Sequence, residues 1–72
     1  MPESTRRLVD AMTYEVVETE GMARDLAEIA HDLAQDRCAA TAQIFRDMSR
    51  KLRVKGLERR GNLAALIVEH DK

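Results

Sequence analysis

The sequence predicts an all-α protein that completes its fold by self-association. The stretch from Asp25 to Val54 contains no proline and no glycine and is rich in Leu, Ala, Arg, Gln and Glu, which favour helices. Trp is absent and only one Tyr and one Phe are present, so the core must consist of aliphatic side chains, which suit packed helices better than a sheet. A chain of 72 residues with a single cysteine has neither a large core nor an internal disulfide to stabilise a monomer, so we expect oligomerisation.

The first helix is predicted over about residues 3–20. Pro2 precedes it, and Leu8, Met12 and Val16 recur within it at helical spacing. Gly21 is predicted to end it through a left-handed C-terminal cap. A second interpretation keeps the helix continuous through Gly21, because the apolar stripes on the two sides are in phase.

The second and longest helix is predicted over residues 25–54. Asp25 and Glu28 have the spacing of a capping box at its start, and Gly56 is predicted to end it. Its apolar residues fall within an arc of about 140°, broader than a coiled-coil seam, which favours a bundle over a long two-stranded coil. The arc contains Met22, Leu26, Ile29, Ala30, Leu33, Ala40, Ile44, Phe45 and Met48.

A short third helix is predicted over residues 62–70, with Asn62 as its N-terminal cap. The first and last helices are nearly long enough together to cover the long helix. We therefore predict a single all-helical domain, residues 1–72, in which the short helices fold back on the long one. Pairing of two such helical hairpins gives a dimeric, four-helix-type bundle.

Two charged residues fall inside the predicted apolar arcs. Arg37 lies near the middle of the arc of the long helix, and Glu15 near the middle of the arc of the first helix. An unpaired buried charge costs several kcal/mol, so a mutual ion pair, within or between subunits, is one prediction. The alternative is a break of the long helix around Asp36 to Thr41, which turns Arg37 to solvent.

Charge is distributed unevenly along the chain. Residues 1–37 carry nine acidic and four basic residues, a net −5, whereas residues 38–60 carry seven basic and two acidic residues, a net +5. Antiparallel pairing of two long helices sets opposite charges against each other, so we expect a two-fold, antiparallel homodimer. Such asymmetry also indicates a charged partner, either an acidic protein or nucleic acid.

The basic stretch 46–60 is the candidate site for such a partner. Arg46, Arg50 and Arg53 share a helix face, and the complete set is Arg46, Arg50, Arg53, Lys55, Arg59 and Arg60. Nothing in the stretch is typical of base recognition, since it contains no aromatic residue. Two hypotheses remain: a dimeric nucleic-acid binder, or a basic face that pairs with the acidic half of a second chain.

A metal site is the third hypothesis. Glu28 and His31 form a Glu-x-x-His pair, which resembles the pairs of ferritin-like di-iron bundles. They lie opposite the apolar arc, so a site requires an oligomer that covers that face, with Glu15 or Glu18 as a further ligand. The resemblance covers four residues, and we expect no metal and no cofactor.

Catalysis is not expected. Cys38 has no His at a fixed spacing, Ser4 and Ser49 have no glycine-rich elbow, and a small helical hairpin offers no deep pocket. The N-terminus lacks the apolar segment of a secretory signal, and no apolar run approaches 18 residues, so we expect a cytoplasmic protein without membrane contact. The function expected overall is that of a small homo-oligomeric interaction or regulatory module.

Overall fold

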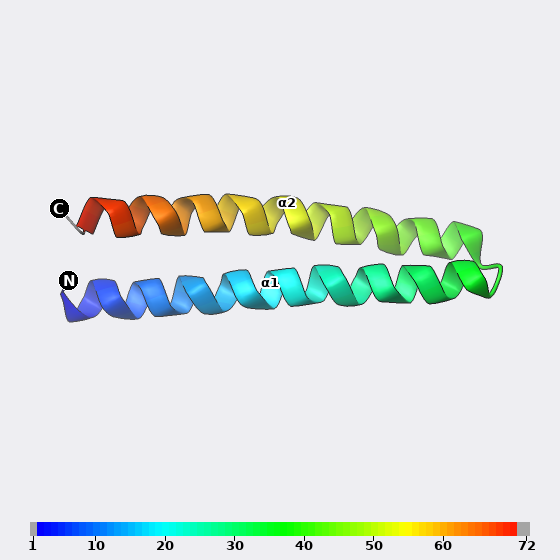
Figure 1. Ribbon diagram of the computed structural model, residues 1–72, viewed down its shortest axis with the longest axis horizontal. Coiled ribbons are helices and arrows are strands. Elements are labelled where there is room, and N and C mark those ends of the chain that lie inside the picture. Colours follow the sequence, from blue (N-terminus) through cyan, green and yellow to red (C-terminus); the bar gives the residue numbers. More distant parts are fainter. Residues whose placement is uncertain (1, 71–72) are drawn as a thin grey trace.

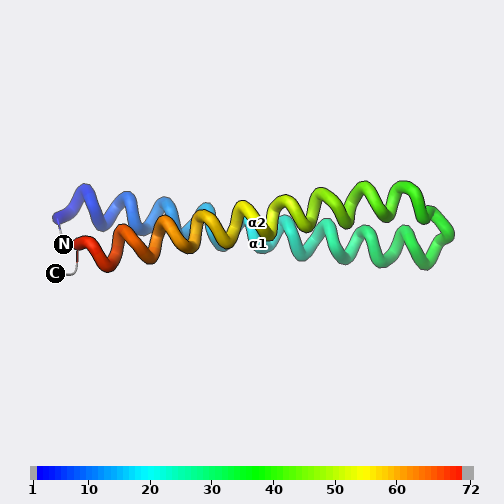
Figure 2. Tube along the Cα trace, turned by 90° about the horizontal axis from the view of Figure 1, so that it is seen from above, coloured from blue at the N-terminus to red at the C-terminus, as the bar shows by residue number. Residues whose placement is uncertain are grey.

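The computed structural model describes residues 2–70, which form two long antiparallel helices joined by a tight turn (Figure 1). Helix α1 comprises Glu3–Gln35 and helix α2 comprises Ala39–His70. The helices lie side by side in both views, and both termini lie at the end opposite the turn (Figures 1 and 2). The radius of gyration is 16.3 Å, whereas a compact domain of this length has about 11 Å. The chain is therefore a rod with very little interior.

The turn replaces the predicted long helix over residues 25–54, which was wrong. Helix α1 ends in a Schellman motif: the backbone N–H of Arg37 donates to the carbonyl of Ala34, and that of Cys38 donates to the carbonyl of Leu33. Arg37 occupies the left-handed position of this motif with φ of 64°, and its side chain is exposed. The alternative break around Asp36 to Thr41, with Arg37 in solvent, is confirmed.

The turn resets the register of the apolar residues. The contact positions of α1 repeat every three and four residues and end at Leu33. Without a break, the same spacing would bring four charged residues into the contact, namely Arg37, Asp47, Lys51 and Glu58. After the turn, the contact positions of α2 contain Phe45, Leu52, Leu63 and Leu66 instead. The break thus replaces four charged contact positions with a set in which Arg59 is the one charged member.

None of the three glycines ends a helix. Helix α1 continues through Gly21, so the predicted boundaries at residues 20 and 25 were wrong and the continuous alternative is confirmed. Helix α2 continues through Gly56 and Gly61, so the separate helix over residues 62–70 is also absent. A glycine inside a helix costs about 1 kcal/mol relative to alanine. Two long helices packed along their full length tolerate that cost because the contact continues on both sides of each glycine.

The fully buried part of the contact between the helices, here called the seam, consists mostly of small residues. Of the seven buried positions in residues 2–70, six recur every seven residues, namely Val16, Ala23 and Ala30 on α1 and Ala42, Ser49 and Gly56 on α2, and the seventh is Thr19. Small side chains allow the two helix axes to approach closely. The buried hydroxyl of Ser49 donates a hydrogen bond of 2.6 Å to the carbonyl of Ala23 across the seam.

Only some of the residues predicted to form the core are buried between the helices. Of the nine residues of the predicted arc, Ala30 alone is buried, while Leu26, Leu33 and Phe45 are half-buried. The remaining five are exposed, namely Met22, Ile29, Ala40, Ile44 and Met48. The prediction of an all-helical hairpin is thus confirmed at the level of the fold, with two helices in place of three.

Candidate functional site

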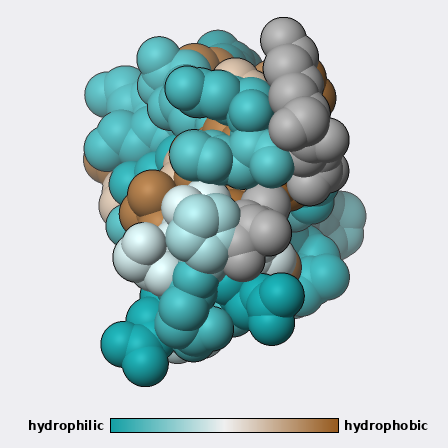
Figure 3. Space-filling model, turned by 90° about the vertical axis from the view of Figure 1, so that its left-hand side faces the viewer, coloured by the Kyte–Doolittle hydropathy of each residue, from teal (hydrophilic) through white to brown (hydrophobic). Residues whose placement is uncertain are grey.

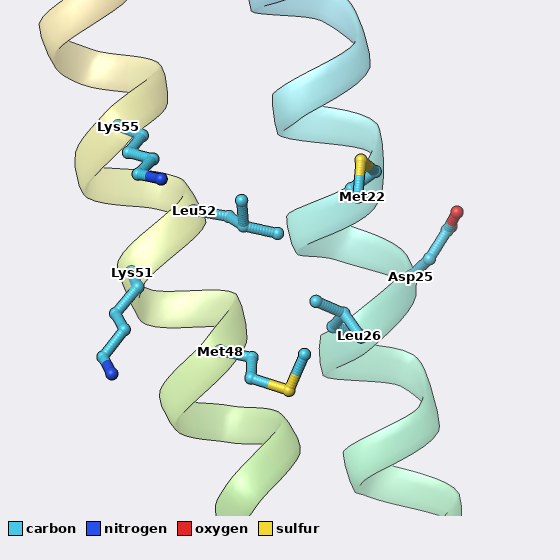
Figure 4. A pocket seen from close by; sticks show the side chains of 7 residues that line it. All are labelled: Met22, Asp25, Leu26, Met48, Lys51, Leu52 and Lys55. Carbon is cyan, nitrogen blue, oxygen red and sulfur yellow. The ribbon is translucent and has the colours of Figure 1, made fainter.

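An apolar groove runs between the helices on one face of the hairpin. Leu26, Met48 and Leu52 point into the space between α1 and α2, whereas Asp25 and Lys51 point away from it (Figure 4). The groove has a volume of about 470 Å³ and is completed by Met22 and Lys55. Its floor is aliphatic, and its rim carries an acid on α1 and two lysines on α2. Such a surface suits an apolar partner with charges at its edges.

The amount of apolar surface is large for a chain of this size. Ten large hydrophobic side chains are exposed, among them Met22 and Met48 in the groove. The total accessible surface is 5536 Å², whereas a compact monomer of 8.2 kDa exposes about 4,500 Å². A view along the rod from the end with the termini shows hydrophobic side chains between hydrophilic ones at the surface (Figure 3).

A second groove, here called the arginine groove, lies on the opposite face. Its basic residues are Arg46, Arg50 and Arg53 on α2 and His31 on α1, and Ala27 and Ser49 complete its lining. Its volume is about 330 Å³. Both small residues leave room between the longer side chains, and no acidic residue lines the groove. The arrangement concentrates three guanidinium groups on one face of one helix, as the i, i+4, i+7 spacing requires.

The next arginines along α2 have partners on α1. Arg59 donates a hydrogen bond to the hydroxyl of Thr19. Arg60 forms a bidentate ion pair with Glu20, in which one N–H···O contact measures 2.8 Å. The hydrogen bond from Arg60, together with its positive charge, lowers the pKa of Glu20, and the same bond raises the pKa of Arg60. This ion pair joins the two helices some distance from the turn.

The basic stretch predicted from the sequence is therefore divided among three environments. Arg46, Arg50 and Arg53 share the arginine groove, Lys55 lies at the rim of the apolar groove, and Arg59 and Arg60 contact α1. His31 and Ala27 were not predicted to join the arginines. They come from the other helix, so only the position of the turn could have revealed them.

The predicted pair of Glu15 and Arg37 does not form within the chain. Both side chains are exposed, with Glu15 near the middle of α1 and Arg37 in the turn. Within residues 2–70, the two ion pairs that form are Arg60–Glu20 and the exposed Arg7–Glu3 pair. The burial that motivated the prediction is absent because the turn removes Arg37 from the helix contact.

Glu28 and His31 lie on the outer surface of α1. With Arg24, Ala27 and Asp32 they line a shallow depression, and Nε2 of His31 lies 3.4 Å from the side-chain nitrogen of Gln35. Glu18 is exposed on the same helix. Across the part of the chain that the structure describes, no cluster of three or more His, Cys, Asp or Glu side chains has an arrangement that could hold a metal ion.

The two helices carry opposite charge. Helix α1 has eight acidic and three basic residues, a net −5, and α2 has seven basic and three acidic residues, a net +4. The antiparallel pairing that the sequence led us to expect between two chains thus occurs inside one chain. Between residues 2 and 70, neither helix has a segment apolar enough to cross a bilayer.

Comparison with protein-family models, with curated proteins and with solved structures finds no match.

Proposed function

We propose that this chain is a non-catalytic interaction module that self-associates through its apolar groove. The observation that carries the proposal is the distribution of side-chain size. The buried positions are occupied by Ala, Ser, Thr, Gly and one Val, while the Leu, Met and Ile side chains are half-buried or exposed. Burial of large apolar side chains is the main favourable contribution to folding, so a monomeric hairpin gains little stability from them.

The excess of exposed surface is large enough to form an interface with a second copy of this chain. The rod exposes about 1,000 Å² more than a compact protein of its mass. A stable interface buries about 800 Å² on each partner. A face-to-face pair of hairpins brings four helices around one core, which is the standard bundle arrangement.

Charge complementarity selects one of the two symmetric ways to pair the faces. A two-fold axis perpendicular to the helices sets α1 on α1, both of net charge −5, and α2 on α2, both of net charge +4. An axis parallel to the helices sets α1 of each copy on α2 of the other. The second arrangement brings the acid-bearing rim of one groove, at Asp25, toward the lysine-bearing rim of the other, at Lys51 and Lys55.

The two candidate nucleophiles, Ser49 and Cys38, have no general base beside them among their hydrogen-bond partners in the described residues. The hydroxyl of Ser49 donates to a backbone carbonyl in the seam, and Cys38 is exposed in the turn. A nucleophile needs an oriented base within hydrogen-bonding distance, and neither side chain has one among its hydrogen-bond partners in the described residues. The proposed role is therefore binding without chemistry.

Sedimentation equilibrium at micromolar concentration tests self-association. We expect a dimer for the parent chain and a monomer for Met48→Lys, which places a charge inside the groove. Leu57→Lys is the matched control, because Leu57 is 71% exposed and lies outside the groove. A monomeric parent, or equal effects of the two variants, contradicts the proposal.

The native cysteine tests the symmetry. Cys38 is the single cysteine of the chain and is exposed in the turn, so a spin label attaches there without any substitution. An axis parallel to the helices places both turns at the same end of the bundle, and the two labels then lie close together. An axis perpendicular to the helices separates them by about the length of the rod, 53 Å. A long distance would show that charge does not determine the pairing.

A further inference from the structure

The arginine groove lies on the face that self-association leaves free. By helical spacing, Arg46, Arg50 and Arg53 point to the side opposite Met48, Leu52 and Lys55. A dimer formed through the apolar grooves would therefore carry one arginine groove on each outer surface. An inference about this groove is independent of whether the chain dimerises.

Within residues 2–70, the three arginines of the groove form no ion pair. The ion pairs found within residues 2–70 involve Arg7 and Arg60, and no acidic residue lines the groove. Like charges at i, i+4 on a helix repel each other. Arg60 lies two turns further along α2 and is neutralised by Glu20, whereas Asp47, the acidic residue beside Arg46 in the sequence, pairs with Gln43.

The side chains in the groove match phosphate oxygens. A guanidinium group is planar, stays charged and binds phosphate through two parallel N–H donors. His31 adds an imidazole from the other helix, and the short side chains of Ala27 and Ser49 leave space for the ligand at the base of the groove. The hydroxyl of Ser49 is already used in the seam, so the donors available to a ligand are the arginines and His31.

The spacing of the arginines matches a chain of phosphates better than a single anion. Arg46 and Arg53 are seven residues apart, a rise of about 10 Å along α2. A nucleic-acid strand in a duplex carries one phosphate for each 3.4 Å or so of helix rise. The groove contains no aromatic residue on which a base could stack. Recognition at this site would therefore involve the backbone and be independent of sequence.

We propose that the arginine groove binds the phosphate backbone of a nucleic-acid strand through Arg46, Arg50, Arg53 and His31. Each contact replaces condensed counterions, so affinity falls steeply with salt.

Titration of the full chain with a fluorescent 20-nucleotide single strand at low salt tests the proposal. We expect binding by the parent and at least a tenfold loss for the double variant Arg46→Gln with Arg50→Gln. The logarithmic salt dependence should also fall by about 0.7 for each phosphate contact removed. The matched control is Lys51→Gln with Lys55→Gln, which removes the same charge from the opposite face and should retain affinity within threefold.

Backbone amide chemical shifts of the parent chain give a readout that needs no variant. Binding in the groove should move the signals of residues 27–31 and 46–53 selectively.

Tripolyphosphate and polyglutamate are the comparison probes. If tripolyphosphate moves the same signals but binds more weakly than the strand, the result supports a nucleic-acid strand as the ligand. If tripolyphosphate binds as tightly as the strand, the ligand is a small phosphate compound and the proposal of a strand is wrong. Binding of polyglutamate as tight as that of the strand, equal losses in the two double variants, or no binding at low salt would overturn the phosphate site.

Discussion

The seam and the apolar groove use side chains in opposite ways. The seam buries small residues such as Ala23, Ala30 and Ser49, and it brings two helices together along their length. The groove beside it exposes Met22 and Met48 and leaves Leu26 and Leu52 half-covered. In a monomeric protein the larger side chains would occupy the interior, because burial of apolar area stabilises the fold in proportion to that area.

This hairpin is therefore organised for close approach of its helices more than for monomer stability. Small seam residues allow α1 and α2 to approach closely, and larger side chains such as Met22 and Met48 lie beside the seam in the apolar groove. The groove therefore has the composition that a protein core normally has. The following predictions alter the seam, the turn or the outer surface to test this division.

The largest effect is expected from enlarging the seam. Ala30 is fully buried, so Ala30→Leu must separate the helices or distort them. We expect the free energy of unfolding to fall by about 1–3 kcal/mol. Urea unfolding followed by circular dichroism at fixed protein concentration measures it. Ala64→Leu, at an exposed position outside both grooves, should stay within about 0.5 kcal/mol of the parent. Equal effects would mean that the seam is not closely packed.

The turn that aligns the seam should become more stable with glycine at position 37. Arg37 has φ of 64°, a conformation that costs a residue with a β-carbon about 1–2 kcal/mol. We expect Arg37→Gly to raise the free energy of unfolding by about 1 kcal/mol. Arg37→Ala should melt near the parent, because it keeps the β-carbon and removes only an exposed charge. A steep loss of stability in Arg37→Ala would instead indicate a buried, paired arginine.

Glycines at the seam and on the outside give a matched pair. A β-carbon at Gly21 meets nothing within 4 Å, whereas one at Gly56 lies 3.5 Å from Cγ of Glu20, an ordinary contact. We expect Gly21→Ala and Gly56→Ala each to raise the free energy of unfolding by about 0.5–1 kcal/mol, the difference in helix propensity. Thermal melts of both variants test it. A gain at Gly21 with a loss at Gly56 would show that the seam is already at its closest approach there.

The smallest effect concerns the exposed ion pair between Glu20 and Arg60. Arg60 lowers the pKa of Glu20 in the folded chain, so the pair stabilises the fold above the pKa of unfolded Glu20 and loses this effect as pH falls through the folded value. The parent should therefore melt above Glu20→Gln near neutral pH, and the difference should shrink on the acidic side of about pH 4. A difference that is constant with pH would assign the effect to packing.

The sequence predicted the class of the fold correctly, but the predicted positions of the helix ends were wrong. The scarcity of aromatic residues, the high helix propensity and the helical spacing of apolar residues correctly indicated helices only. The glycines were interpreted as helix ends, since glycine is common there. The actual end lies at Arg37, a residue type with no preference for the left-handed conformation. Local propensity therefore pointed to the wrong sites, and packing between helices chose the right one.

The candidate sites were predictable to different degrees. Spacing along one helix was enough to place Arg46, Arg50 and Arg53 on a common face. It was not enough to add His31, to separate Lys55 from that face or to pair Arg60 with Glu20, because each of those relations depends on the alignment of α1 with α2. The apolar groove has the same origin, since its residues come from both helices.

Residue types and their spacing are enough to predict that the chain is helical, that its halves have opposite charge and that its apolar residues follow helical periods. Which residues are buried depends on the packing of α1 on α2, since the position of one turn sets the register between the helices. That register places Ala, Ser and Gly in the seam, sets Met22, Leu26, Met48 and Leu52 along one groove and gathers Arg46, Arg50 and Arg53 along the other. Contacts between residues distant in sequence depend on this alignment, which no local pattern contains.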